Sequence, residues 1–333
     1  MIVWSARVCL VAIGLLTSVA LGAEVGIPLP PGLQGGPVHV PEDNPITAEK
    51  VALGKQVFWD TRLSADGSVA CVSCHLPEHG WADPRPLSVH VGGVITRRRS
   101  PTLVNRLFSV QQGWAGSFES LEDFGQRDVT RRDGRMAFQR LAAIPGYQAA
   151  FRQVFGTEVT AESLARALAS YMRTILSGNA PYDRYRAGDQ AALSAAAQRG
   201  LALFEGKARC ARCHSGPNFT DEGYHNLGVG MSRDQPDLGR FLVTQREANR
   251  GAFKTPTLRD AARRPPYMHD GSLRTLAEVV ELYDRGGAPN PGLSPELVAL
   301  GLTAAERQDL VAFLTSLTGE VSPEVTTRPI LPP

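Results

Sequence analysis

The sequence predicts an all-α protein built from two similar, internally duplicated domains with irregular arms at both ends. Helical periodicity recurs along the chain, strand-like alternation is scarce, and the pattern Cys-x-x-Cys-His occurs at 71–75 and again at 210–214. With 333 residues, 43% of them hydrophobic and 20% charged, the chain is long enough for two modest domains. We expect these domains over residues 42–180 and 190–319.

The first element, residues 1–22, has the layout of a secretory signal peptide. A short start with one arginine precedes the apolar stretch VCLVAIGLLTSVA, and small residues follow near Ala23. The apolar run is too short for a membrane span, so an uncleaved anchor is the less favoured alternative. We expect a periplasmic protein with no membrane span in the mature chain. Its net charge of +2 argues against a nucleic-acid partner.

Helices are predicted on both sides of a boundary at 177–194. The stretches LGKQVFWDTRLSADGSVACVSCH and RGLALFEGKARCARCH each place a glycine and an apolar–Phe pair ahead of the Cys-x-x-Cys-His pattern, so a helix should lead into each. The segment 160–177 has a polar start and one apolar face, formed by Leu164, Leu168, Tyr171 and Ile175. The Pro- and Gly-rich segments 26–46 and 320–333 are expected to be irregular arms.

Two further helices are marked by capping signals near the C-terminus. Thr275 and Glu278 form a capping-box pattern, and Gly286 ends the segment. A second capping box opens the segment 303–319, which closes on Gly319. The first helix carries an apolar stripe, made of Leu276, Val279, Val280 and Tyr283. On spacing alone, Tyr283 is a core residue.

Four cysteines remain once the first 22 residues are removed, and all of them lie in the two repeated patterns: Cys71, Cys74, Cys210 and Cys213. Two thiols at this spacing can add to the two vinyl groups of one porphyrin, and His75 or His214 then binds the iron. A zinc ribbon, a redox-active cysteine pair and two disulfides are the alternatives. None of these requires a histidine at the same offset in both patterns. The sequence predicts two covalently bound haem c groups, one in each domain.

Four stretches occur together along the chain: RLSADGSVACVSCH, RRSPTLVN, FKTPTLRDAARRPPYMHDGSL and LYDRGG. Together they resemble the bacterial di-haem cytochrome c peroxidase and MauG family over residues 42–319. The resemblance implies two cytochrome c-like haem domains whose haems face each other. It implies reduction of hydrogen peroxide with electrons from a small periplasmic cytochrome c or cupredoxin, or, in MauG-type members, from a protein substrate. A non-enzymatic electron carrier or redox sensor is the third alternative.

The resemblance also implies axial ligands. Family peroxidases carry Met, and MauG-type members Tyr, fourteen residues after the His of HDG, and this position after His269 is Tyr283. We expect Tyr283 to bind the iron held by His214, with Met268 as the alternative. On the first haem, His90 and a vacant sixth position are equally open.

The resemblance places Trp114 between the haems, where an indole can couple the two irons. At two positions the chain departs from the family: Phe124 replaces a Gln, and Arg135 replaces the Glu that serves peroxide. Since phenylalanine cannot transfer a proton, Arg135 and Glu122 are the catalytic candidates. Further carboxylates nearby are Asp123, Asp128 and Asp133.

The family holds a calcium ion between its domains. In this chain Arg99 and Arg264 stand beside the expected site, and guanidinium groups repel a cation. Calcium is therefore doubtful, and we expect arginine to take its electrostatic place.

Overall fold

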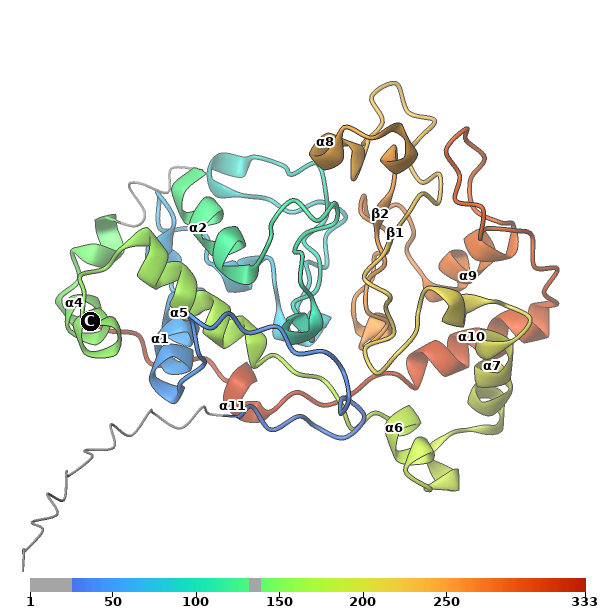
Figure 1. The fold of residues 1–333 in the computed structure, drawn as a ribbon, viewed down its shortest axis with the longest axis horizontal. Coiled ribbons are helices and arrows are strands. Elements are labelled where there is room, and N and C mark those ends of the chain that lie inside the picture. Colours follow the sequence, from blue (N-terminus) through green and yellow to red (C-terminus); the bar gives the residue numbers. More distant parts are fainter. Residues whose placement is uncertain (1–25, 132–138) are drawn as a thin grey trace, which may run out of the picture.

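The computed structural model describes residues 26–131 and 139–333. The expected signal peptide and Arg135 lie outside the described residues. Two groups of helices lie side by side, with loops and one strand pair between them (Figure 1). The first group comprises α1 (Ala48–Trp59), α2 (Leu121–Arg131), α4 (Pro145–Phe155) and α5 (Ala161–Arg173). The second comprises α7 (Ala195–Glu205), α9 (Leu276–Asp284) and α10 (Ala304–Thr315).

The remaining described elements are short. The short α-helices are α6 (Pro181–Arg186), α8 (Phe241–Thr244) and α11 (Pro323–Thr326). Strands β1 (Tyr224–His225) and β2 (Phe253–Lys254) pair antiparallel, with Tyr224 opposite Lys254. The fold is therefore mainly helical with little sheet, which differs from a strictly all-α expectation by this one pair. No described helix has the length and apolar character needed to cross a bilayer.

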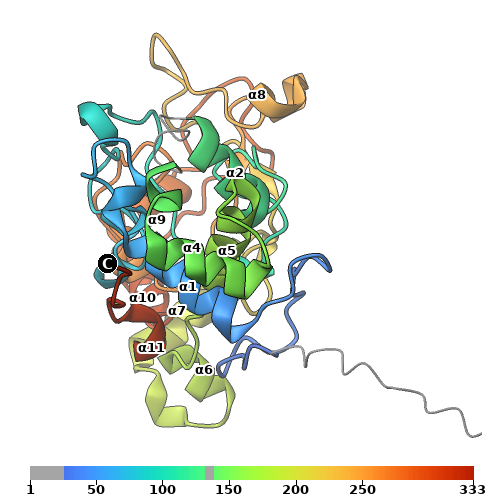
Figure 2. The same cartoon turned by 90° about the vertical axis from the view of Figure 1, so that its left-hand side faces the viewer.

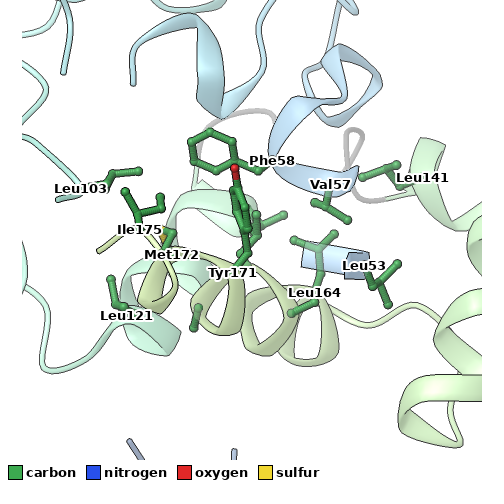
Figure 3. Close-up of a cluster of buried hydrophobic side chains, with 14 of the residues drawn as sticks. Leu53, Val57, Phe58, Leu103, Leu121, Leu141, Leu164, Tyr171, Met172 and Ile175 are labelled. Atoms are coloured by element: carbon green, nitrogen blue, oxygen red, sulfur yellow. The ribbon is translucent and has the colours of Figure 1, made fainter. Parts of the chain in front are cut away.

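The first core lies between α1 and α5, as Figure 3 shows. Figure 2 shows α4 and α5 from that end of the molecule. Gly54 lets the two helices approach closely, because a Cβ there would lie 1.9 Å from the carbonyl oxygen of Ala167. One turn later, Phe58 is 1% exposed and packs against Tyr171 with ring centroids 5.2 Å apart. Truncating a side chain buried this deeply costs about 3–5 kcal/mol.

The second core repeats this arrangement between α7 and α10. A Cβ on Gly200 would lie 2.0 Å from the carbonyl oxygen of Asp309, so glycine again permits the close crossing. Phe204 follows one turn later and packs against Phe313 at 4.9 Å. The glycine and phenylalanine that precede each Cys-x-x-Cys-His pattern therefore serve the same packing in both domains.

Helix starts follow the predicted caps more closely than helix ends. Thr160 caps α5, and Thr303 with Glu306 forms the predicted capping box of α10. Both helices end earlier than expected, at Arg173 and Thr315. Gly319 is not a cap, and a Cβ there would lie 2.6 Å from the carbonyl oxygen of Gly178, so its role is close chain approach.

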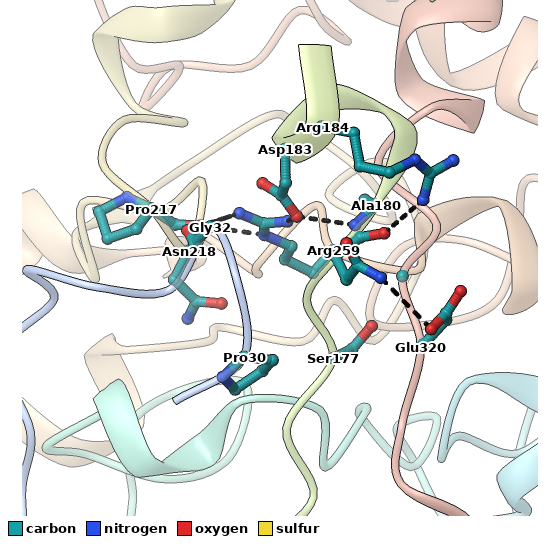
Figure 4. A network of polar contacts seen from close by, with 12 residues as sticks. Pro30, Gly32, Ser177, Ala180, Asp183, Arg184, Pro217, Asn218, Arg259 and Glu320 are labelled. Atoms are coloured by element: carbon teal, nitrogen blue, oxygen red, sulfur yellow. Dashed lines mark hydrogen bonds and ion pairs between the residues drawn. The ribbon is translucent and has the colours of Figure 1, made fainter. Parts of the chain in front are cut away.

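Both arms join the two helix groups. The N-terminal arm, residues 26–46, has no regular element, whereas the C-terminal arm contains α11 and returns to the first group, where Arg62 donates to the carbonyl of Pro332 at 2.6 Å. Figure 4 shows a buried ion pair, Asp183–Arg259 at 2.5 Å. Arg259 also donates to the carbonyl of Gly32 in the N-terminal arm at 3.0 Å.

Candidate functional site

The two Cys-x-x-Cys-His patterns form the same single turn. Cys71–Ser73 and Cys210–Arg212 are both 3-10 helices. In each, the histidine amide donates to the carbonyl of the first cysteine, at 3.1 Å for His75 and 2.9 Å for His214. The local hydrogen bonds therefore place two thiols and one imidazole on each turn.

A backbone carbonyl lies beside Nδ1 of each histidine. Nδ1 of His75 lies 3.2 Å from the oxygen of Trp81, and Nδ1 of His214 lies 3.0 Å from that of Phe219. A carbonyl only accepts, so Nδ1 carries the proton and Nε2 keeps the lone pair that an iron needs. Burial lowers the pKa of both histidines to about 4, so both imidazoles are neutral near pH 7.

Both turns open onto one cavity of about 1270 Å³, which exceeds the ~300–1,000 Å³ of common small-molecule sites. All four cysteines and both histidines line it. The thiols are free, and burial raises the pKa of Cys210 to about 12. Two free thiols beside a neutral imidazole on each turn are the groups that covalent haem c needs.

In the second domain, α9 turns its apolar stripe toward this cavity. Leu276, Val279, Val280 and Tyr283 all line it, so the stripe faces the cofactor space. Burial and the nearby sulfurs of Cys210 and Cys213 raise the pKa of Tyr283. Met268 lines the same cavity, so the structure brings both ligand candidates to it.

In the first domain, α2 forms part of the cavity wall. Phe124 lines it and packs edge-on against Phe118 at 5.1 Å. Asp128, one turn further along α2, also lines the cavity, and its charge acts on Cys71. His90 lines the cavity from a separate loop. Asp128 is therefore the carboxylate that α2 offers to this site.

Glu122, one of the sequence-based catalytic candidates, contacts α5 in this structure. It does not line the cavity among the described residues, and its carboxylate bonds both terminal nitrogens of Arg173, at 2.5 and 2.8 Å. It also accepts from Nδ2 of Asn44 at 2.7 Å. Helical spacing explains the difference, because Glu122 lies half a turn from Phe124, on the face of α2 that contacts α5.

Trp114 lies on the cavity wall and is bonded by both domains. Its indole nitrogen donates to the carbonyl of Arg99 at 2.7 Å, and its own carbonyl accepts from the amide of Lys254 at 2.8 Å. Arg240 donates to the two following carbonyls, those of Ala115 and Gly116, at 2.9 and 2.8 Å. The segment around Trp114 is thus held from the second domain.

The two arginines expected near a calcium site contact each other. Nη2 of Arg99 donates to the carbonyls of Arg264 and Pro265, at 2.9 and 3.3 Å. Both arginines line the cavity and are buried. Arg106 and Lys254 also line the cavity, and sequence reasoning did not single out either as a site residue, although Lys254 lies in the quoted stretch that begins FKTPTLR.

Comparisons with known proteins agree with this geometry. Residues 48–191 match the family model described as di-haem cytochrome c peroxidase, and 197–318 match that of cytochrome c. The chain is 44% identical over 299 residues to the methylamine utilization protein MauG of Methylorubrum extorquens, which covers 88% of this chain and 84% of that protein. This chain belongs to the di-haem cytochrome c peroxidase family. It therefore carries two covalently attached haem c groups and is an oxidoreductase.

Two further relatives support the membership of this chain in the di-haem cytochrome c peroxidase family. Cytochrome-c peroxidase IdrP1 of Denitromonas iodatirespirans is 43% identical over 317 residues, covering 84% of each chain. A solved structure of a MauG-like protein associated with microbial copper homeostasis matches with a TM-score of 0.80 and 30% identity. That match covers 88% of this chain and 96% of the other.

Proposed function

We propose that this protein is a periplasmic peroxidase that reduces hydrogen peroxide to water with electrons from a small protein donor, a cytochrome c or a cupredoxin. One observation carries the proposal: two equivalent Cys-x-x-Cys-His turns open onto one cavity whose wall includes Trp114. Haem, when bound there, supplies the redox-active iron. Trp114, bonded by both domains, offers an aromatic group for electron transfer between the sites.

The two sites differ in their surroundings, which supports a division of roles. Beside His214, Tyr283 faces the cavity from α9 and is proposed as the iron ligand, since a tyrosinate favours the ferric state. Beside His75, the wall offers Phe124 and Asp128, with His90 as the candidate sixth ligand. We assign peroxide to the His75 site.

Peroxide reduction to two water molecules consumes two electrons and two protons. Phe124 supplies no proton, and Glu122 is held by Arg173 away from the cavity. Asp128 is the described carboxylate of α2 that lines the cavity, so we propose that it delivers protons, with Arg135 stabilising negative charge.

The first test replaces Asp128 by Asn in the haem-containing protein. Because a positioned acid–base group contributes about 10²–10⁴-fold, peroxide turnover should fall by at least tenfold. Asp123→Asn is the matched control: Asp123 lies on the same helix, pairs with Arg127 at 2.6 Å and does not line the cavity. Stopped-flow measurement with a reduced donor protein gives the rates.

Equal rates in Asp128→Asn and the wild type would remove Asp128 from the mechanism and leave Arg135→Ala as the next variant. A protein whose haem spectra do not respond to peroxide would instead be an electron carrier or redox sensor.

A second candidate function is MauG-like oxidation of a partner protein. Tyr283 favours it, because the resemblance associates tyrosine at this position with MauG-type members. The relatives named MauG and IdrP1 have nearly equal identity to this chain, so identity does not separate the two functions. Peroxide consumption that requires a protein substrate, and fails with cytochrome c and cupredoxin donors, would favour the second.

The remaining expectations stay proposals. Export by residues 1–22 is proposed from the sequence, as are domains at 42–180 and 190–319 and their origin by duplication. We also propose that calcium is not required, since the guanidinium of Arg99 already bonds the carbonyls of Arg264 and Pro265.

A further inference from the structure

The wall between the two Cys-x-x-Cys-His turns carries an excess of buried positive charge. The cationic side chains that line the cavity include Arg99, Arg106, Arg264 and Lys254. Lys254 forms an ion pair with Glu222 at 2.5 Å. Among the described residues, none of the three arginines has a carboxylate within 4.0 Å.

The three guanidinium groups bond only neutral oxygens of described residues. Arg106 donates to Oε1 of Gln112 at 2.7 Å and to the carbonyl of Gln111 at 3.0 Å. Arg264 donates to the carbonyl of Thr257. Arg99 donates to two carbonyls through Nη2, while its Nε is buried and has no partner.

Burial of these charges is costly without an anion. Arg99 is 4% exposed and Arg264 is 7% exposed, and burial lowers the pKa of each to about 10. The carboxylates that act on them at longer range, Asp83 and Asp260, already form ion pairs with other arginines. A buried cation is retained in proteins when a partner compensates it, so an anion should enter this cavity.

The cofactor itself supplies that anion. Each haem c carries two propionate carboxylates, and a guanidinium can bind a carboxylate through two parallel hydrogen bonds. The charge of Arg99 acts on His75 and that of Arg264 acts on His214, so each arginine is within electrostatic range of a different haem site, while the two arginines contact each other. We propose that Arg99, Arg106 and Arg264 bind the haem propionates and that the free Nε of Arg99 donates to one of them.

This arrangement would join the cofactors to the aromatic group between the domains. The carbonyl of Arg99 accepts from the Trp114 indole at 2.7 Å, and its amide donates to the carbonyl of His269 at 2.8 Å. One residue thus orients Trp114 through its backbone and a propionate through its side chain. The proposal rests on haem content and is independent of activity with peroxide.

A crystal structure of the wild-type di-haem protein tests the contact directly. We expect a propionate oxygen within hydrogen-bond distance of Nε of Arg99, and propionate contacts to Arg106 and Arg264. Water or another anion at Nε, with all propionates directed away from the three arginines, would overturn the proposal. This measurement does not depend on any variant folding.

Redox titration of Arg99→Gln provides a second test. Loss of a buried cation beside haem stabilises the ferric form, so the midpoint potential of one haem should fall. We expect the reduction equilibrium to change at least tenfold, which corresponds to about 59 mV for one electron. Arg99→Lys should restore most of it because it keeps the charge. Arg97→Gln is the control, since Arg97 lines the same cavity but is exposed and therefore screened by solvent. Unchanged potentials in Arg99→Gln, or an equal fall in Arg97→Gln, would count against specific pairing.

Discussion

Each histidine that follows a Cys-x-x-Cys pair has a backbone carbonyl beside its Nδ1, which favours a proton on that nitrogen. Because Nδ1 of His75 and His214 must donate, Nε2 is the nitrogen left for iron. The carbonyls come from Trp81 and Phe219, six and five residues further along the chain. The turn that follows each pattern therefore prepares the ligand before the cofactor binds.

The pKa of Tyr283 is shifted in the opposite direction from those of the two histidines. Burial and the sulfurs of Cys210 and Cys213 raise its pKa, so the phenol is neutral without a cation. Ferric iron can stabilise the tyrosinate in this cavity, since an adjacent positive charge favours the ionised form.

At the residue scale, we predict that Tyr283→Phe changes the haem held by His214. The loss of an anionic donor should raise the midpoint potential of that haem and alter its ferric EPR signal, through a high-spin state or binding of Met268. Tyr267→Phe is the control, because Tyr267 also lines the cavity but donates to the carbonyl of Ala261 at 3.1 Å. An EPR spectrum identical to wild type in Tyr283→Phe would return Tyr283 to a packing role.

At the scale of elements, two glycines determine how closely pairs of helices approach, and an ion pair joins α2 to α5. Gly54 and Gly200 permit the α1–α5 and α7–α10 crossings. Glu122 of α2 pairs with Arg173 of α5, whose side chain is 3% exposed. Burial alone raises the pKa of Glu122, but the hydrogen bonds and charge of Arg173 outweigh it and hold that pKa below its usual value.

We predict that Glu122→Gln lowers the free energy of unfolding by about 3 kcal/mol, because it leaves the Arg173 charge buried and uncompensated. Glu158→Gln is the control: its ion pair with Arg152 is exposed on both sides, so the loss should stay below about 1 kcal/mol. Denaturant unfolding at neutral pH measures both.

The pH dependence of this effect has a defined sign. A carboxylate with a depressed pKa in the folded state contributes stability above its unfolded pKa and loses it as pH falls through the folded value. The difference between Glu122→Gln and wild type should therefore be full at neutral pH and shrink in acid, below the ordinary glutamate pKa of 4.5. A difference that stays constant into strong acid would contradict the assigned ion pair.

At the scale of the whole molecule, two separate cores share one cavity. The hydrophobic core of the first helix group shares no residue with that of the second, and a smaller third cluster, which includes Leu33 and Phe108, lies under the N-terminal arm. Polar contacts cross between the domains, such as the bonds of Arg240 to the Trp114 segment, and the buried pair Asp183–Arg259 joins the boundary segment to the second domain. The domains are thus held together without a common core.

We predict that haem attachment at the two turns is independent. Replacing Cys210 and Cys213 by Ser should halve the haem content per chain, and replacing Cys71 and Cys74 should do the same, because each turn has its own histidine and its own core. A haem stain after denaturing electrophoresis and the pyridine haemochrome spectrum measure it. Complete loss of haem from either double variant would mean that the sites depend on each other.

Much of the fold and part of the site could be predicted from local spacing. Thr303 caps α10 as expected, α5 begins at the polar start expected near residue 160, and the α9 stripe faces one direction. Sequence spacing did not distinguish Glu122, which bonds Arg173, from Asp128, which lines the cavity, because a side chain's face on α2 depends on which helix packs beside it.

The sequence by itself determined the two haem turns, since the two thiols and the imidazole of each turn lie on five consecutive residues. It also determined the family, and it showed which residues share the apolar face of α5 and of α9. Only the tertiary structure decided which groups share the cavity, such as Arg99 and Arg264, which are 165 residues apart yet in contact. Such pairs depend on how two separate cores pack against each other, and no local periodicity encodes that distance.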